Sequence, residues 1–311
     1  MKHIFFLTIT CILGQFVLGQ QNTDREKIVA GTYQPVQHFV FPKTQFDRST
    51  RVAQSVIERA KFHQYVFNFA YTACIDTEFQ LPIWVSHHVN KSLLTNIYNK
   101  RPSNYPRDLQ TPIIKTDAYE GSGYDHGHLA PAADFRWNKE AFEQSHFMSN
   151  MSPQHGCFNQ KGWCHLEATV RKWVEEDSTA NAYVVSGAFV DEFIDTLCVN
   201  KQLRVFVPRY FYKVVLVTSK LKENFAIGFK IPNSDISNDS LQQYACTVRT
   251  IEEQTNLDFF TFLPRSEQDS LEEKLPTVKF YSGTLDCPNK SCESTYNGRI
   301  KPENRTKLKC D

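Results

Sequence analysis

Residues 121–135 read GSGYDHGHLAPAADF, and this stretch decides more about the fold and the function of the chain than any other part of the sequence. After a Gly-Ser-Gly turn, His126 and His128 stand on either side of Gly127. A glycine here would let the backbone bend tightly and expose a side chain. Because the unperturbed pKa of histidine is about 6.5, a neutral imidazole is available to accept a proton at physiological pH. Taken alone, the pattern also suits two histidines in an ordinary loop.

Two further segments follow closely, SNMSPQ at residues 149–154 and NQKGWCHLE at residues 159–167. The carboxamide of Asn159 offers a hard, uncharged oxygen, which suits Mg²⁺ because this ion prefers oxygen ligands and keeps several waters. By itself, an asparagine at the start of an expected helix is more often a cap. Glu167 and Arg171 are an i, i+4 pair, either a surface ion pair or a carboxylate for metal-bound waters beside a guanidinium for a phosphate. Together these groups indicate metal-assisted hydrolysis of a phosphodiester.

The three segments also carry a resemblance to a known family. Its signature is D-R-G-H-x-x-P, then S-N-x-x-P-Q, then N-x-x-x-W-x-x-L-E, and this chain has DHGHLAP, SNMSPQ and NQKGWCHLE in that order. The chain thus resembles the DNA/RNA non-specific endonucleases over residues 62–270, including the runs VVSG, VPRYFYKVV and IEEQTNLDFF. Its D-H-G-H variant is similar to that of secreted arthropod nucleases from crab and shrimp. The resemblance implies an α+β, ββα-metal (His-Me finger) fold with a mainly antiparallel sheet, packed helices and disulfide bonds.

The resemblance also implies a set of catalytic roles. His128 would be the general base, and Asn159 would bind Mg²⁺ directly, with Mn²⁺ as a substitute. Glu167 would order the water shell of the ion. Asn150 would position His128 or the phosphate, and Arg171 would stabilise the transition state.

A second group of residues is expected on the substrate side of the site: Asp125, His126 and Gln154. His126 stands where the family usually has arginine, so its phosphate-binding or structural role is in question. An upstream arginine of the family has two candidate counterparts, Arg101 and Arg107.

The function expected from these residues is a secreted, Mg²⁺-dependent endonuclease that acts on DNA, with RNA as a further substrate. Duplex DNA is favoured by the resemblance, and cleavage would leave 5′-phosphate and 3′-hydroxyl ends. Contacts to phosphates do not read base edges, so little sequence specificity is expected. The alternative is a catalytically weak nucleic-acid-binding protein on the same scaffold. It is motivated by His126 and by a net charge of +1, which gives no global sign of nucleic-acid binding.

The N-terminal residues predict export. A basic start and an apolar run to Leu18 are typical of a signal peptide, so we expect an extracellular protein with no membrane anchor. The chain has nine cysteines, and the eight beyond Cys11 predict disulfides whose pairing and partners stay open, as does the oligomeric state. Sequons at Asn90, Asn238, Asn289 and Asn304 fit this location, whereas Asn150 is expected to carry no sugar. The expected divisions are a signal peptide at 1–19, an extension at 20–61, the nuclease domain at 62–270 and a Cys-containing tail at 271–311.

Local patterns predict an irregular order of strands and helices, which favours an α+β fold. Strands are expected at residues 63–72, 81–89, 182–190, 203–208, 212–218 and 224–232, with a further strand-like run at 258–263. Helices are expected at residues 139–147, 160–176 and 240–253, the last capped by Ser240, and residues 149–158 are expected to form a loop.

Overall fold

The structure is a computed structural model that describes residues 43–44, 62–111, 119, 121–199, 203–236, 238–281 and 287. All of these residues belong to one compact unit, residues 39–311. The expected signal peptide and most of the expected extension and tail lie outside the described residues. No helix within the described part is long and apolar enough to span a bilayer.

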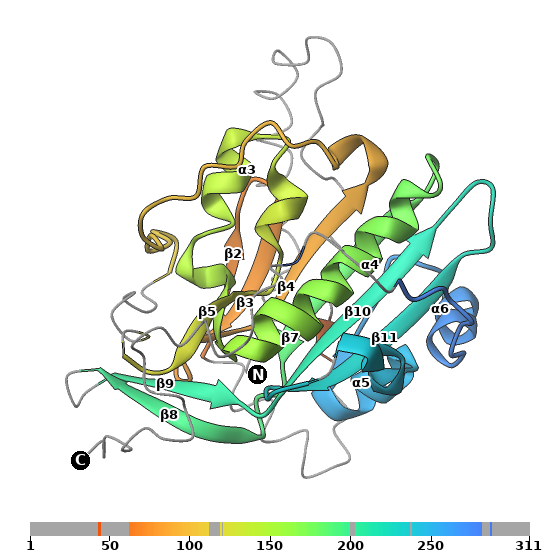
Figure 1. The fold of residues 1–311 in the computed structure, drawn as a ribbon. Coiled ribbons are helices and arrows are strands. Elements are labelled where there is room, and N and C mark those ends of the chain that lie inside the picture. Colours follow the sequence, from red (N-terminus) through yellow and green to blue (C-terminus); the bar gives the residue numbers. More distant parts are fainter. Residues whose placement is uncertain are drawn as a thin grey trace, which may run out of the picture. The chain divides into compact units, whose positions relative to one another are not determined.

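A seven-stranded antiparallel sheet forms the centre of this unit (Figure 1). Its strands follow the order β12-β11-β10-β7-β4-β3-β2. Their bounds are β2 His63–Phe67, β3 Tyr71–Asp76, β4 Leu81–Asn90, β7 Asn181–Ala188, β10 Tyr210–Thr218, β11 Phe225–Pro232 and β12 Ala245–Cys246. Most side chains of the central strands are buried on both faces because both faces of the sheet are covered.

Successive side chains of the central strands enter two separate cores. On β7, Val184 packs into one core and Val185 into the other. The first core includes Leu166 and Val170 of helix α4 (Cys164–Glu175), which packs against β4, β7 and β10 and lies over the sheet in Figure 1. The second core includes Ile251 of α5, so the helices α5 (Val248–Thr255) and α6 (Arg265–Glu272) cover the opposite face. The expected apolar stripe of α4 is confirmed.

Three small elements carry or support the candidate site. The hairpin β5 (Tyr124–His128) and β6 (Met151–His155) lies beside the first core, and α3 (Lys139–Gln144) stands between the two strands in the chain. A π-helix, η7 (Phe158–Trp163), leads directly into α4. The remaining elements are four short helices and two strand pairs. The helices are η3 Lys91–Leu93, η5 Ala132–Phe135, η6 Met148–Asn150 and η8 Asn238–Tyr244. The strand pairs are β8 Phe193–Val199 with β9 Leu203–Pro208, and β1 Lys43–Thr44 with β13 Leu257–Asp258.

Several expected elements are wrong in detail. Residues 63–72 form a hairpin rather than one strand, because the chain turns at Asn68. Residues 149–158 include β6, which pairs with β5 instead of forming a loop. The helix expected from Ser240 begins only at Val248, where the Thr247 side chain caps it. The strand-like run 258–263 ends early because Phe260 adopts a left-handed backbone conformation, with φ of 51°.

One disulfide among the described residues, Cys164–Cys287, joins the start of α4 to the C-terminal region. Cys157 is also disulfide-bonded. Cys74 on β3 and Cys246 on β12 are free thiols, so the expectation that all eight cysteines pair is wrong for these two. Cys74 is buried in the second core and fills space there as a small apolar side chain.

Candidate active site

The β5–β6 hairpin fixes the position of His128. His128 is the last residue of β5 and lies opposite Met151 of β6 in the antiparallel register. Gly127 lies opposite Ser152, and its φ is not in the left-handed region. A Cβ at Gly127 would come within 2.1 Å of the Gln154 side chain. Glycine is therefore needed here for space rather than for the tight bend expected from the sequence.

The backbone that follows His128 is held at almost every polar group. Trp163 Nε1 donates to the carbonyl of His128 at 3.0 Å. The Leu129 N–H donates to the carbonyl of Asn150, and the Ala130 N–H donates to Asn150 Oδ1 at 2.9 Å. Asn150 Nδ2 donates in turn to the carbonyl of Ala130 at 2.8 Å. Asn150 is fully buried, so its side chain serves this turn and is not exposed to a phosphate or a sugar.

The imidazole of His128 lies perpendicular to that of His146, with ring centroids 5.1 Å apart. Burial lowers the pKa of His128 well below its usual range, and the nearby His146, Arg101 and His126 lower it further. The Nε2 atom of His128 is buried and has no hydrogen-bond partner among the described residues. His128 is therefore a neutral imidazole with a nitrogen left for another molecule.

His126 is enclosed by aromatic rings on both faces. Tyr105 stacks on one face at 4.2 Å between ring centroids, and Tyr119 stacks at 4.4 Å. This position fits a packing role better than the expected contact with substrate. Gln154 is likewise fully buried against Gly127, with no hydrogen-bond partner for its amide among the described residues, and it too lies inside the hairpin rather than on a substrate-facing surface.

Asp125 orients Asn159 rather than facing a substrate. Asn159 Nδ2 and Gln160 Nε2 both donate to Asp125 Oδ2, at 3.1 and 3.0 Å. Because the amide nitrogen of Asn159 is committed to Asp125, the Oδ1 atom points away from that carboxylate. The bond to Asp125 therefore sets the direction of the Asn159 oxygen, the kind of hard donor that a divalent cation prefers.

Glu167 lines a narrow recess on the first face of the sheet, and Arg171 is bonded to Asp134, which also lines it. Glu167 lines it together with Asp134, Lys213 and His87. Burial raises the pKa of Glu167 to about 7, although the charges of Lys213 and Arg171 act in the opposite direction. Arg171 donates to Asp134 Oδ1 at 3.0 Å, and its side chain is only 12% exposed. Arg171 is thus held beside a buried carboxylate, not on an open helix surface.

Of the two upstream arginines, the structure favours Arg101. Both Arg101 and Arg107 are exposed. The charge of Arg101 lowers the pKa of His128, His146 and Glu167, whereas Arg107 has no such influence on these groups. Arg101 is therefore the upstream arginine whose charge acts on the groups of the candidate site.

Comparisons with known proteins identify the family of this chain. Residues 52–266 match the family described as DNA/RNA non-specific endonuclease. The chain belongs to this family. It is 28% identical over 221 residues to the mitochondrial nuclease of Saccharomyces cerevisiae, covering 65% of this chain and 67% of the relative. It is 26% identical to the nuclease of Serratia marcescens, covering 67% and 79% of the two chains. A solved structure of the EndoG/EndoGI complex matches 68% of this chain and 93% of its own with a TM-score of 0.56 and 25% identity.

Family membership makes the protein a metal-dependent endonuclease that acts on nucleic acid, and it confirms the expected fold. The expected extracellular location is wrong on the same comparisons. The relatives from S. cerevisiae, Schizosaccharomyces pombe, zebrafish, mouse and human are mitochondrial nucleases, which points to the mitochondrion. The N-terminal pattern that suggested export lies outside the described residues.

Two residues that the structure places beside the candidate site, His146 and Lys213, were not predicted from the sequence. His146 follows α3, and its Nδ1 lies 2.8 Å from the carbonyl of Phe142, so it donates there. Lys213 lies in the middle of β10 and is 1% exposed. A lysine inside the apolar run YFYKVVLVT was the available signal, because a buried charge needs a partner.

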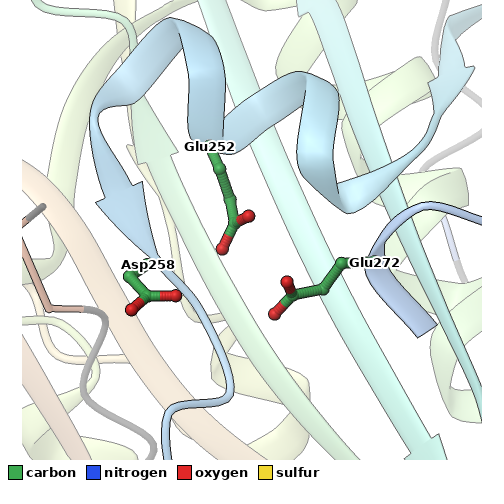
Figure 2. A group of neighbouring side chains, drawn as sticks. All are labelled: Glu252, Asp258 and Glu272. Carbon is green, nitrogen blue, oxygen red and sulfur yellow. The ribbon is translucent and has the colours of Figure 1, made fainter. Parts of the chain in front are cut away.

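Another acidic cluster of the nuclease lies elsewhere. Figure 2 shows Glu252, Asp258 and Glu272 pointing toward one another, with candidate ligand atoms within 4.8 Å. Among the described residues, these three acidic side chains are close enough together to surround a metal ion. They come from α5, β13 and α6, on the face of the sheet opposite α4. Arg249 already lies 2.7 Å from Glu252 and 3.0 Å from Glu272, so two of the three acidic side chains are paired with an arginine.

Proposed function

We propose that this protein is a Mg²⁺-dependent endonuclease that hydrolyses DNA with little sequence specificity and leaves 5′-phosphate and 3′-hydroxyl ends. The main support for the proposal is the pair of hydrogen bonds that join η7 to β5. Asn159 of η7 is bonded to Asp125, and Trp163 of η7 is bonded to His128. Asp125 and His128 are three residues apart on one strand, so about 10 Å separates their backbones. The bonds from η7 thus tie Asn159 and the backbone of His128 to the same short strand.

The residues around Asn159 fit a magnesium ion. The Oδ1 atom is a hard ligand whose direction is set by the bond from Nδ2 to Asp125. Glu167, further along the continuous η7–α4 segment, would accept hydrogen bonds from metal-bound waters. When bound, the cation would polarise a non-bridging phosphate oxygen and offset the charge that develops on the leaving oxygen. Mn²⁺ has the same preference for oxygen and is expected to substitute.

His128 would act as the general base. Its buried Nε2 would accept a proton from the attacking water, and it is available for this because the ring is neutral. The turn held by Asn150 and Trp163 keeps the ring in place. Arg101, which is exposed, would contact the phosphate, and Arg171 would support the site through Asp134.

The preference for duplex DNA over RNA rests on the resemblance of the D-H-G-H motif. Contacts from a bound cation and from Arg101 would go mainly to the phosphate backbone of the nucleic acid, so binding should weaken as the salt concentration rises. RNA cleavage under the same conditions would broaden the substrate without changing the chemistry.

Cleavage of plasmid DNA by the full chain tests the proposal. His128→Ala should reduce the rate by about 10²–10⁴-fold, the usual contribution of a general base, and EDTA should abolish cleavage. His63→Ala is the matched control, because His63 lies on the edge strand β2 beside Asp76 and should leave the rate unchanged. Ligation of the products without prior phosphorylation reports 5′-phosphates. Cleavage by His128→Ala at the wild-type rate, or without divalent ions, would contradict the mechanism.

A further inference from the structure

Lys213 is an ionisable side chain to which neither the sequence motifs nor the proposed mechanism assigns a role. It lies on β10 near the centre of the seven-stranded sheet and is 1% exposed. An ammonium group is costly to bury unless charges and hydrogen bonds compensate for the lost water. Because the side chain is enclosed, it cannot contact a nucleic acid directly, and any role must act through its neighbours.

Three neighbours hold the ammonium group. Lys213 Nζ donates to Ser186 Oγ at 2.6 Å, and Ser186 lies directly opposite it on β7. The same nitrogen lies over the ring of Trp163, 4.3 Å from its centroid, and 3.5 Å from the carbonyl oxygen of Leu129. Lys213 thus joins the central sheet to the residue that follows His128.

This contact completes the set of bonds around the His128 turn. Trp163 holds the carbonyl of His128, Lys213 holds that of Leu129, and Asn150 holds the groups of Ala130. Trp163 and Lys213 also touch each other, so two successive carbonyls are bound by one packed pair. Loss of the lysine would free the Leu129 carbonyl and loosen the Trp163 ring against the adjoining turn.

Lys213 also balances the charges of the recess. Lys213 and Arg171 face the carboxylates of Asp134 and Glu167, while burial lowers the pKa of His87, which keeps this histidine neutral. Burial lowers the pKa of Lys213 to about 8, while Glu167 and Asp134 act to raise it. Without the lysine, two carboxylates would share one arginine.

We propose that Lys213 is a positioning residue of the nuclease. It holds the Leu129 carbonyl, and with it the backbone after His128, and its positive charge balances the carboxylate of Glu167 in the shared recess. The inference rests on the proposed function, since it assigns Lys213 a part in the same reaction. A lysine that served only the stability of the sheet would leave the rate of the folded enzyme unchanged. A lysine that bound substrate would act on KM.

Steady-state cleavage of duplex DNA with Mg²⁺ separates these roles in three variants of the full chain. Lys213→Met should lower kcat by about 10²-fold, as expected for a misplaced reacting group, with KM within about threefold of wild type. Lys213→Arg keeps the charge and should recover kcat to within about tenfold of wild type. Lys230→Met is the matched control, because Lys230 lies on the neighbouring strand β11 and packs on Tyr210 toward the opposite face. Its kcat should not change.

A kcat for Lys213→Met within about threefold of wild type would overturn the proposal, and so would a loss confined to KM or a failure of Lys213→Arg to recover. If Lys213→Met does not fold, Ser186→Ala tests the proposal instead. This change removes the hydroxyl that binds Lys213 Nζ and keeps the charge of the lysine. It should lower kcat by about 3–10-fold at unchanged KM, and an unchanged kcat there would refute the role.

Failure of the proposed function is recognised separately, by a wild-type chain that does not cleave nucleic acid. In that event a crystal structure of Lys213→Met, or of Ser186→Ala, still tests the positioning role. Unmoved backbone at residues 128–130 would overturn it, and a displaced Leu129 carbonyl would support it.

Discussion

The two faces of the central sheet each bury charged groups, but they use them differently. On the α5–α6 face, Arg249 contacts Glu252 and Glu272 directly, and it donates to Asp269 at 2.9 Å. On the α4 face, Glu167 shares a recess with several charges, and the neighbouring His128 keeps a buried nitrogen without a partner among the described residues. On the α5–α6 face the carboxylates meet an arginine of their own, whereas on the α4 face the buried imidazole nitrogen of His128 has no such partner among the described residues and is suited to chemistry.

Removal of the arginine on the α5–α6 face should have the largest effect on stability. Arg249→Met would remove the arginine that contacts Glu252, Glu272 and Asp269, and breaking a buried pair of this kind costs about 3 kcal/mol. Denaturant unfolding measures the loss, and the kcat of the folded variant should stay at the wild-type value. A clear fall in kcat would mean that the two faces are not independent.

The next largest effect is expected at the bond that orients the metal ligand. Asp125→Ala would free the Asn159 amide, and loss of such a supporting partner typically lowers metal affinity or activity by about 10–100-fold. Isothermal titration with Mg²⁺ measures the affinity. Asp191→Ala, at an exposed position after β7, is the control and should bind as the wild type does. Equal affinity in the Asp125 variant would show that Asn159 does not depend on this bond.

The pH dependence of cleavage should follow Glu167. Its pKa is raised to about 7, so the carboxylate becomes ionised as the pH rises through that value. Only the ionised form accepts hydrogen bonds from the waters of a cation at both oxygens. We therefore expect kcat/KM to fall by up to about tenfold per pH unit below pH 7. A Glu167→Gln variant should be slower, and its kcat/KM should not fall with pH below pH 7. If the fall persists in this variant, another group causes it.

The smallest effect concerns Glu272 and the stability of the α5–α6 face. Burial raises its pKa to about 8 in the folded state, above the ordinary value of 4.5. A carboxyl group with a raised folded pKa favours the folded state when protonated, so its contribution is lost as the pH rises from about 4.5 to about 8. The Tm of the wild type should therefore fall over this range by about 2–4 °C more than that of Glu272→Gln. Parallel Tm curves for the two proteins would contradict the assignment.

Local sequence patterns predicted the regular elements that depend on their own residues. The apolar stripe of α4 was predicted because its side chains recur at helical spacing. The short strand β6 was not, since MSPQH has no strand pattern and is extended only because β5 pairs with it. Helix α6 was also missed, because it is polar and is held by Arg249 rather than by an apolar stripe.

The candidate site shows the same division. The motifs named His128, Asn159 and Glu167 because histidine, amide and carboxylate chemistry is visible in residue types and spacing. They placed Asp125 and His126 toward the substrate, whereas the structure uses Asp125 to orient Asn159 and encloses His126 between Tyr105 and Tyr119. Hydrogen bonds and ring stacking between distant segments decide these roles, and spacing along the chain does not encode them.

The amino-acid sequence by itself determined the family of this protein and the kinds of chemical group at its centre, because both are written in short ordered motifs. Only the tertiary structure decided which of those groups are neutral, which are buried and which are held. Those properties depend on the loss of water and on the charges of residues brought together from separate strands. Lys213 illustrates the point, since an isolated lysine in an apolar strand acquires a meaning only when Leu129, Ser186 and Trp163 surround it.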